Sequence, residues 1–431
     1  MWIVLLLGCA DPSASTGSPG AFDDEPAPTD TAEELPAGDS GPVPTPETER
    51  LCRLELECAV LPTRDVKVPC ALTVATEGGE IEYAGSAEVW VRGRSSSQVA
   101  KPGYGVELND GAGTAVAANL LGMGSDSDWV IDGLYYDRLL IRDKLGYDLF
   151  RSWGGDNQYA AESALCELWR NDDYFGVHAL VERVKRDDDR VDIADGTESG
   201  EAFVMSQLDE DCFYTNTATY GCWKLVSPAA PTADAQDHIL RLLAEWEADV
   251  VAAPSEGDWS RVWESTDIDS VIDTVLIEEF FKNEDAFYTS MHMSRDAGKG
   301  IRFIPWDLDM TFGQFPFYPY GNYGAHDVWI GYRPALWTNF AQDPEFRARL
   351  AARWAELRAG SLEEGALHAR MDELQAILGE AIARNDEVWP IESINYGGWF
   401  FVVGSYADED AYVRAWIHER LLWMDAHIAE Y

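Results

Sequence analysis

The sequence predicts a two-lobed α+β domain over residues 51–431, preceded by a short apolar leader and a polar tether. Segments typical of strands concentrate in the first half of the chain, and segments with helical spacing of apolar residues concentrate in the second half. Hydrophobic residues make up 46% of the chain and aromatic residues 12%, which is enough apolar surface for a large core. These observations together favour one large globular domain with an N-terminal appendage.

The first nine residues are typical of a bacterial lipoprotein leader. A short apolar run over 1–7 is followed by Gly8 and Cys9, and Leu6-Leu7-Gly8-Cys9 fits the lipobox, in which the cysteine is acylated. The run is too short to cross a bilayer as a helix, which needs about 20 apolar residues. We therefore expect an exported protein that is anchored to the bacterial cell envelope through lipid on Cys9. The alternative is a chance cysteine in an apolar leader.

Residues 10–50 are rich in Pro, Asp, Glu, Ser, Thr, Gly and Ala, with almost no large apolar side chain. Such a segment cannot bury enough surface to fold, so we expect a flexible tether that holds the domain away from a membrane.

The cysteine count agrees with export. The chain has seven cysteines, and six remain when Cys9 is set aside as the lipid site, an even number suited to three disulfide bonds. The sequence leaves their pairing open. The spacing contains no CxxC pair of the kind that binds zinc, so a disulfide framework in an oxidising compartment is the better interpretation. The six are Cys52, Cys58, Cys70, Cys166, Cys212 and Cys222.

The formal net charge of −45 argues against general nucleic-acid binding, because such a surface repels phosphate backbones. A site for any polyanion in this chain must gather positive charge locally, from metal ions and a few Lys or Arg side chains.

The first half of the domain contains the strand signals. We predict strands over 87–91 and 104–108 around the turn-prone Arg92–Ser97 segment, and a hairpin of 164–169 and 176–184 around Asn171-Asp172-Asp173. A helix is predicted between these pairs, over 139–153. The later helices are predicted over 238–253, 267–282, 344–358, 362–385 and 408–430.

The region 265–313 has the most informative pattern. Thr266 and Asp269 can form a capping box before an apolar helical stripe, which ends at Lys282 and places Asp285 in the following loop. Strands over 287–293 and 301–304 then flank a strong turn signal, and Pro305-Trp306-Asp307-Leu308-Asp309 follows at once. A hairpin that folds back in this way brings Asp285 and Asp307 to one edge of a sheet.

Phosphoryl transfer needs this kind of layout, because the protein supplies mainly positioning and charge neutralisation. One carboxylate orients the attacking hydroxyl, and one or two others hold Mg²⁺ against the nucleotide phosphates. The order helix, acidic loop, hairpin, acidic loop is also the order in the C-terminal lobe of protein kinases.

Several motifs resemble those of the CotH (spore-coat protein H) kinase family over about residues 52–430. They are Asn283-Glu284-Asp285, Pro305–Asp309, Arg92–Ser96 followed by Lys101–Tyr104, Trp129-Val130, Asp137–Asp143 and Tyr174–Glu182. Each motif is weak alone, and their order and spacing are fairly specific. The resemblance implies an atypical protein-kinase-like fold with two lobes.

The resemblance also implies roles for individual residues. Asp285 would be the catalytic carboxylate, Asp307 and Asp309 would bind Mg²⁺ or Mn²⁺, and ATP would be the phosphate donor. Lys101 would bind the nucleotide phosphates, with Glu182 as its paired carboxylate. Arg92 and Arg142 are candidates for phosphate contact or for structural pairing. The implied activity is transfer of the ATP γ-phosphate to Ser or Thr of a secreted or envelope protein.

Two departures from the family pattern concern the second metal site. Ser290, with His292 nearby, stands where the family often has Asn, and Asp143 replaces a more common Asn. A non-catalytic surface-binding or adhesion module that kept the scaffold is therefore the alternative. A third possibility is transfer of AMP or an amino acid instead of phosphate.

Overall fold

The computed structural model describes residues 46–64, 66–154, 158–208, 212–215, 222–316, 324–331, 333–394, 398, 400 and 403–431. Cys9 and nearly all of the predicted tether lie outside these residues, so the lipid anchor stays a prediction. Residues 46–50, which were assigned to the tether, belong to the folded unit that begins at Thr45. A 3-10 turn at Glu47–Glu49 carries Glu49 to within 2.7 Å of Arg370, which fastens this end of the chain.

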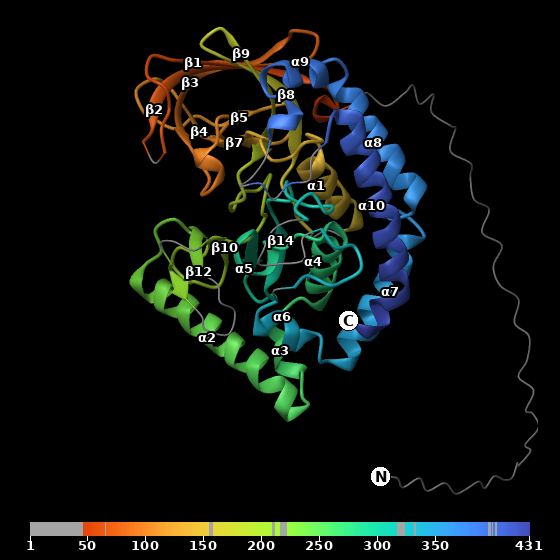
Figure 1. The fold of residues 1–431 in the computed structure, drawn as a ribbon. Coiled ribbons are helices and arrows are strands. Elements are labelled where there is room, and N and C mark those ends of the chain that lie inside the picture. The colour runs from red at the N-terminus through yellow and green to blue at the C-terminus, as the bar shows by residue number, and fades with distance from the viewer. Residues whose placement is uncertain are drawn as a thin grey trace, which may run out of the picture. The chain divides into compact units, whose positions relative to one another are not determined.

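The first half of the domain closes into a seven-stranded barrel that the sequence did not predict (Figure 1). The strand order is β1-β2-β3-β4-β7-β9-β8, and β1 closes the barrel by pairing in parallel with β8. Inward-facing side chains such as Leu54, Val74 and Val106 are fully buried and fill the interior. The barrel strands are β1 Cys52–Cys58, β2 Val68–Ala75, β3 Ile81–Val91, β4 Tyr104–Asn109, β7 Asp128–Asp132, β8 Ser163–Arg170 and β9 Asp173–Glu182.

A second sheet of five strands, in the order β11-β12-β10-β13-β14, joins segments from both halves of the chain. Its central strand β10 pairs antiparallel with β12 on one side and with β13 on the other. The strands are β10 Phe203–Leu208, β11 Tyr214–Thr215, β12 Cys222–Ser227, β13 Met291–Arg295 and β14 Arg302–Pro305; a separate short pair is β5 Ala118–Asn119 with β6 Ser125–Asp126.

The second half of the chain is mainly helical, as predicted, and Figure 1 shows α7, α8 and α10 along one flank of the folded unit. Within the described ranges, no helix combines the length and apolarity that a bilayer span requires. The helices are α1 Arg142–Trp153, α2 Ala233–Glu256, α3 Ser260–Ser265, α4 Ile268–Phe281, α5 Ala286–Thr289, α6 Ala335–Phe340, α7 Pro344–Arg358, α8 Glu364–Leu378, α9 Ala381–Val388 and α10 Tyr406–His427.

Three predicted elements need correction. The strand expected over 287–293 is wrong in its first part, because the short helix α5 occupies Ala286–Thr289 and β13 begins only at Met291. The helix expected over 362–385 is broken after Leu378, where Gly379 adopts φ +47°. The helix expected from 139 begins at Arg142, because Leu140 lies in the left-handed region with φ +63°.

The N-cap of α4 also differs from the prediction by one residue. The carboxylate of Asp267 accepts hydrogen bonds from the backbone N–H groups of Asp269 at 3.1 Å and Ser270 at 3.2 Å. The Thr266 hydroxyl, which was expected to cap the helix, accepts instead from Trp246 Nε1 at 2.8 Å. α4 is buried along most of its length, so its end at Phe281 fixes where the following acidic loop begins.

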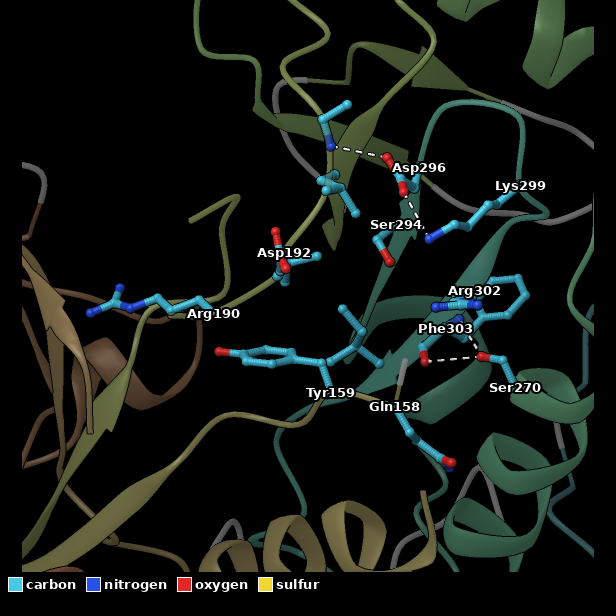
Figure 2. Close-up of a pocket in the computed structure, with 14 residues that line it drawn as sticks. Gln158, Tyr159, Arg190, Asp192, Ser270, Ser294, Asp296, Lys299, Arg302 and Phe303 are labelled. Carbon is cyan, nitrogen blue, oxygen red and sulfur yellow. Dashed lines mark hydrogen bonds and ion pairs between the residues drawn. The ribbon is translucent and has the colours of Figure 1, made fainter. Parts of the chain in front are cut away.

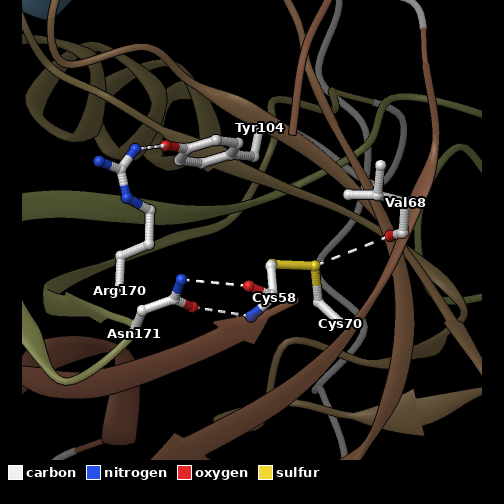
Figure 3. The surroundings of a disulfide bond; sticks show 6 residues. All are labelled: Cys58, Val68, Cys70, Tyr104, Arg170 and Asn171. Carbon is white, nitrogen blue, oxygen red and sulfur yellow. Dashed lines mark hydrogen bonds between the residues drawn. A yellow bond between two sulfur atoms is a disulfide. The ribbon is translucent and has the colours of Figure 1, made fainter. Parts of the chain in front are cut away.

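The six remaining cysteines form three disulfide bonds, as predicted. Cys52–Cys166 crosses the parallel β1–β8 pair that closes the barrel, and Cys58–Cys70 crosses the β1–β2 pair. Figure 3 shows how Asn171, at the tip of the β8–β9 hairpin, holds Cys58: its side chain accepts from Cys58 N at 2.8 Å and donates to Cys58 O at 3.1 Å. The third bond, Cys212–Cys222, lies beside β12.

Candidate active site

A cleft of about 800 Å³ is bordered by barrel strands, by β10 and β12 of the five-stranded sheet, and by the two acidic loops around β13 and β14. It collects most of the candidate residues, although they are far apart in the sequence. The candidates that line it are Arg92, Lys101, Asp285, Asp307 and Asp309, joined by Ser290, His292 and Asp132.

Asn283 connects the two acidic loops of the cleft. Its side-chain oxygen accepts from the backbone N–H of Asp285 at 3.3 Å, and its side-chain nitrogen donates to the backbone carbonyl of Asp307 at 3.2 Å. The loop after α4 and the loop after β14 are therefore held together by one amide. Asp285 itself stands at the N-terminal end of α5.

Asp307 has an uncommon backbone conformation, with φ +65°. A non-glycine residue there costs energy and persists only when its surroundings hold it. Three contacts do so: its N–H donates to the Tyr147 hydroxyl at 3.1 Å, its carbonyl accepts from Asn283, and its carboxylate accepts from the Ser290 hydroxyl at 3.2 Å. The side chain is exposed to the cleft.

Two further carboxylates complete the acidic cluster: Asp143, which the sequence indicated only as a departure from the family pattern, and Asp132, which it did not assign to the site. Asp143, in the first turn of α1, is buried and accepts from the backbone N–H of Leu308 at 2.6 Å. Asp132 ends β7 and lines the cleft. The sequence signal for Asp132 was an acidic residue at a strand end, directly before Gly133. The structure shows why glycine stands there: a Cβ on Gly133 would lie 2.5 Å from the backbone oxygen of Lys101.

Several like charges lie close together in the acidic cluster. Partial desolvation in the cleft, followed by the charges of Asp132 and Asp285, raises the pKa of Asp307 to about 6. Burial and the neighbouring carboxylates also raise the pKa values of Asp143 and Asp309 well above the usual range. Carboxylates that raise one another's pKa in a cleft are typical of functional sites.

The barrel contributes two positively charged side chains to the lining of the cleft, Arg92 and Lys101. Arg92 lies with its guanidinium carbon 5.3 Å from the centre of the Trp306 ring, and its charge acts to lower the pKa of Asp307. Lys101 is only 1% exposed, and burial lowers the pKa of its ammonium group to about 7, although Asp132 and Asp137 act in the opposite direction.

The structure does not bring Glu182 to Lys101. The Glu182 carboxylate accepts from the Tyr159 hydroxyl at 2.9 Å and from the backbone N–H of Glu162 at 2.8 Å, and burial raises its pKa to about 7. The described partner of Lys101 Nζ is the side-chain oxygen of Asn385, at 3.1 Å. The expected Lys101–Glu182 pair is therefore wrong for this structure.

Arg142 pairs with protein carboxylates. Its guanidinium contacts Asp137 and Glu409, each at 2.6 Å, and all three side chains are fully buried. Of the two roles left open for Arg142, the structure supports structural pairing.

Ser290 and His292 flank the acidic loops. The Ser290 hydroxyl is bonded to Asp307, so the residue that departs from the family pattern still contacts the acidic cluster. His292 packs edge-on against Trp306, and burial, with the charges of Arg92 and Arg183, lowers its pKa to about 3. A neutral His292 is the expected form at physiological pH.

Asp307 and Asp309 are oxygen donors of the kind that Mg²⁺ takes when a substrate completes its shell. In the described ranges, no three carboxylate, histidine or cysteine side chains form a preformed metal site. Mg²⁺ usually takes one or two protein carboxylates and completes its shell with water and substrate phosphates. The excess negative charge around Asp307 fits that requirement better than a site closed by protein ligands alone.

A second cavity, of about 400 Å³, lies beside the β13–β14 hairpin (Figure 2). Its three cationic side chains are each paired with a carboxylate: Lys299 with Asp296 and Arg302 with Asp267, both at 2.9 Å, and Arg190 with Asp126 at 3.4 Å. None of the predicted catalytic, metal or nucleotide residues lines it, so the larger cleft is the candidate active site.

Comparison with known proteins agrees with these motifs. The model of the CotH kinase protein family matches residues 89–424, which is most of the chain. The match begins within β3 and includes the cleft residues on the barrel and on both acidic loops. A comparison with curated proteins finds no match. The chain therefore belongs to the CotH kinase family.

Proposed function

We propose that this protein transfers the γ-phosphate of ATP to a Ser or Thr hydroxyl of another protein. The observation that carries the proposal is one cleft that contains two acidic loops tied together by Asn283, facing Lys101 and Arg92 from the barrel. Phosphoryl transfer needs positioned carboxylates, a divalent metal and phosphate-binding cations in one place, and family membership supports the same reaction.

Each residue then has a defined task. Asp285 would accept the proton of the attacking hydroxyl and orient its oxygen. Asp307 and Asp309 would hold Mg²⁺ or Mn²⁺, which supplies charge neutralisation to the phosphates when bound. Lys101 and Arg92 would contact phosphate oxygens, and the raised pKa values of the acidic cluster support a cation-binding role.

The kinase-like arrangement in two lobes is part of the proposal. The barrel would act as the nucleotide-binding lobe, because it carries Arg92 and Lys101. The helical half with β13 and β14 would act as the catalytic lobe, because it carries Asp285, Asp307 and Asp309. The presence of all five residues in the lining of one cleft supports this division.

We further propose that the acceptor is a secreted or envelope protein. The three disulfide bonds favour an oxidising compartment, and the predicted lipid on Cys9 would hold the domain at a membrane. The net charge of −45 leaves nucleic acid a poor partner.

Transfer from radiolabelled ATP, with Mg²⁺ or Mn²⁺, to casein or envelope proteins tests the reaction. Wild type should transfer label, and Asp285→Ala should transfer at least about 100-fold less. Equal transfer by both would overturn the assignment of Asp285. Wild type with no transfer and no heat of ATP binding in calorimetry would instead indicate a binding module, and intact mass of the product would reveal AMP transfer.

A further inference from the structure

We propose that Asn385, on helix α9, positions Lys101 for the nucleotide phosphates, an inference that rests on the proposed function. Lys101 Nζ donates to Asn385 Oδ1 at 3.1 Å, across 284 positions of the sequence. Both residues are buried, at 1% and 6% exposure. Asn385 thus occupies the place that the sequence had assigned to the carboxylate of Glu182.

The orientation of the Asn385 amide is set by its partners. Its Oδ1 accepts from the backbone N–H of Val177 at 3.0 Å as well as from Lys101 Nζ. Both partners are donors, so the oxygen must face them. The approach is close enough to require glycine at the neighbouring position: Gly176 has φ +94°, and a Cβ there would lie 2.7 Å from Asn385 Oδ1.

Helix α9 is fastened to the barrel on both sides of Asn385. Trp389 Nε1 donates to the backbone carbonyl of Phe175 at 2.9 Å, and Arg384 forms a two-bond contact with Glu167 at 2.8 and 2.9 Å. These contacts hold the helix against β8 and β9. A contact from the C-terminal half of the chain thereby fixes the position of a lysine in the nucleotide-binding barrel.

A neutral amide leaves the charge of Lys101 uncompensated by direct contact. Among the residues that the structure describes, no carboxylate forms an ion pair with its Nζ. The facing titratable groups are Asp132 and Asp137, which favour the ammonium form, and His178, whose pKa is lowered well below its usual range by burial and then by Lys101. Burial dominates and lowers the pKa of Lys101 to about 7. ATP phosphates would restore the charged form, so ATP should bind more tightly below neutral pH.

Two substitutions at Asn385 separate positioning from folding. Asn385→Leu removes the acceptor, whereas Asn385→Asp keeps both hydrogen bonds and adds a negative charge that raises the pKa of Lys101. Glu387→Gln is the matched control, since it changes an exposed side chain of the same helix that plays no part in fastening α9 to the barrel. Circular dichroism and thermal unfolding establish that each variant is folded.

Calorimetry between pH 6 and 9 then measures the affinity of each variant for Mg²⁺-ATP. Asn385→Leu should weaken ATP binding about tenfold at pH 7, and Asn385→Asp should bind as wild type and retain affinity to higher pH. Glu387→Gln should match wild type. If Asn385→Leu matches wild type, or if Asn385→Asp is as weak as Asn385→Leu, the inference is overturned while the proposed function stands. Wild type without ATP binding overturns the proposed function and this inference with it.

Titration of the Lys101 ammonium by NMR gives a readout that needs no nucleotide. The midpoint should lie near 7 in wild type and should rise in Asn385→Asp, with Lys101→Arg used to assign the signal. An unchanged midpoint in Asn385→Asp would show that Asn385 does not hold Lys101, whatever the protein does with ATP.

Discussion

Two clusters of charged side chains begin at neighbouring residues of α1 and have opposite character. Arg142 points into a sealed cluster, where it contacts Asp137 and Glu409 at 2.6 Å. Asp143, the next residue, belongs to the cluster of Asp307 and Asp309, where carboxylates raise one another's pKa. One cluster is closed by opposite charges, and the other has an excess of negative charge at the border of a cleft.

This difference separates a structural charge from a functional one. A buried ion pair completes its own electrostatics, so it needs no ligand. A group of carboxylates with raised pKa values has too little positive charge around it, and a cleft allows a further cation to enter. The local sequence does not distinguish the two cases, because an acidic or basic residue at a helix start fits either.

Breaking the sealed cluster should give the largest effect. Arg142→Met removes the cation that contacts both acids; it leaves Asp137 buried without an arginine and Glu409 with Arg138 alone, at 3.6 Å, so the free energy of unfolding should fall by about 3–5 kcal/mol. Urea unfolding followed by circular dichroism measures it. A loss below about 1 kcal/mol would mean that the cluster is not sealed.

Removing one charge from the open cluster, which contains Asp143, Asp307 and Asp309, should lower activity and leave stability unharmed, the reverse of the effect at Arg142. Asp307→Asn should lower phosphoryl transfer at least about 100-fold, while the free energy of unfolding should stay equal or rise because one of several like charges is removed. Asp296→Asn, in the turn of the same hairpin, is the control and should retain activity. A stability loss in Asp307→Asn as large as that of Arg142→Met would remove the distinction between the clusters.

The sequence predicted the local parts of this picture and missed what depends on distant pairing. Alternating strands and the apolar stripe of α4 are local, so their positions could be read directly. The barrel is closed by β1 pairing with β8, more than 100 positions away, as in the Cys52–Cys166 disulfide at a separation of 114. No periodicity within either strand indicates that partner.

The same limit applies to the candidate site. Asp285, Asp307 and Asp309 follow recognisable element ends, so the acidic loops could be predicted. Asp132 ends a barrel strand and Asp143 begins α1, and only the fold brings them to the other carboxylates. Asn385 was harder to predict. The apolar spacing of 362–385 continues through the break at Gly379 that separates α8 from α9, so the sequence did not indicate a separate helix that carries Asn385 to the barrel.

Glu182 lies between the two cases, because its carboxylate is buried and its hydrogen bonds come from neutral donors. Its pKa rises from 4.5 to about 7 on folding, so the folded state binds a proton that the unfolded state has lost. The contribution of Glu182 to the free energy of unfolding is fully present below pH 4.5 and is lost as the pH rises through about 7. The loss between pH 5 and pH 7 is about 2 kcal/mol.

Glu182→Gln tests this linkage, since it keeps the shape of the side chain and removes its ionisable group. Its free energy of unfolding, measured against wild type at pH 5 and pH 7, should lack that part of the pH dependence. Parallel curves for the two proteins would show that Glu182 ionises in the folded state as it does in the unfolded chain.

The smallest effect concerns Ser290, whose hydroxyl donates to Asp307 at 3.2 Å. A hydrogen bond to a charged group contributes at least about 1 kcal/mol, so Ser290→Ala should lower transfer about fivefold. Ser290→Asn restores a donor and should retain activity, which steady-state rates at saturating Mg²⁺-ATP would measure. If alanine and asparagine variants both match wild type, Asp307 is held by its backbone contacts alone, and the open cluster depends on Tyr147 and Asn283 for its geometry.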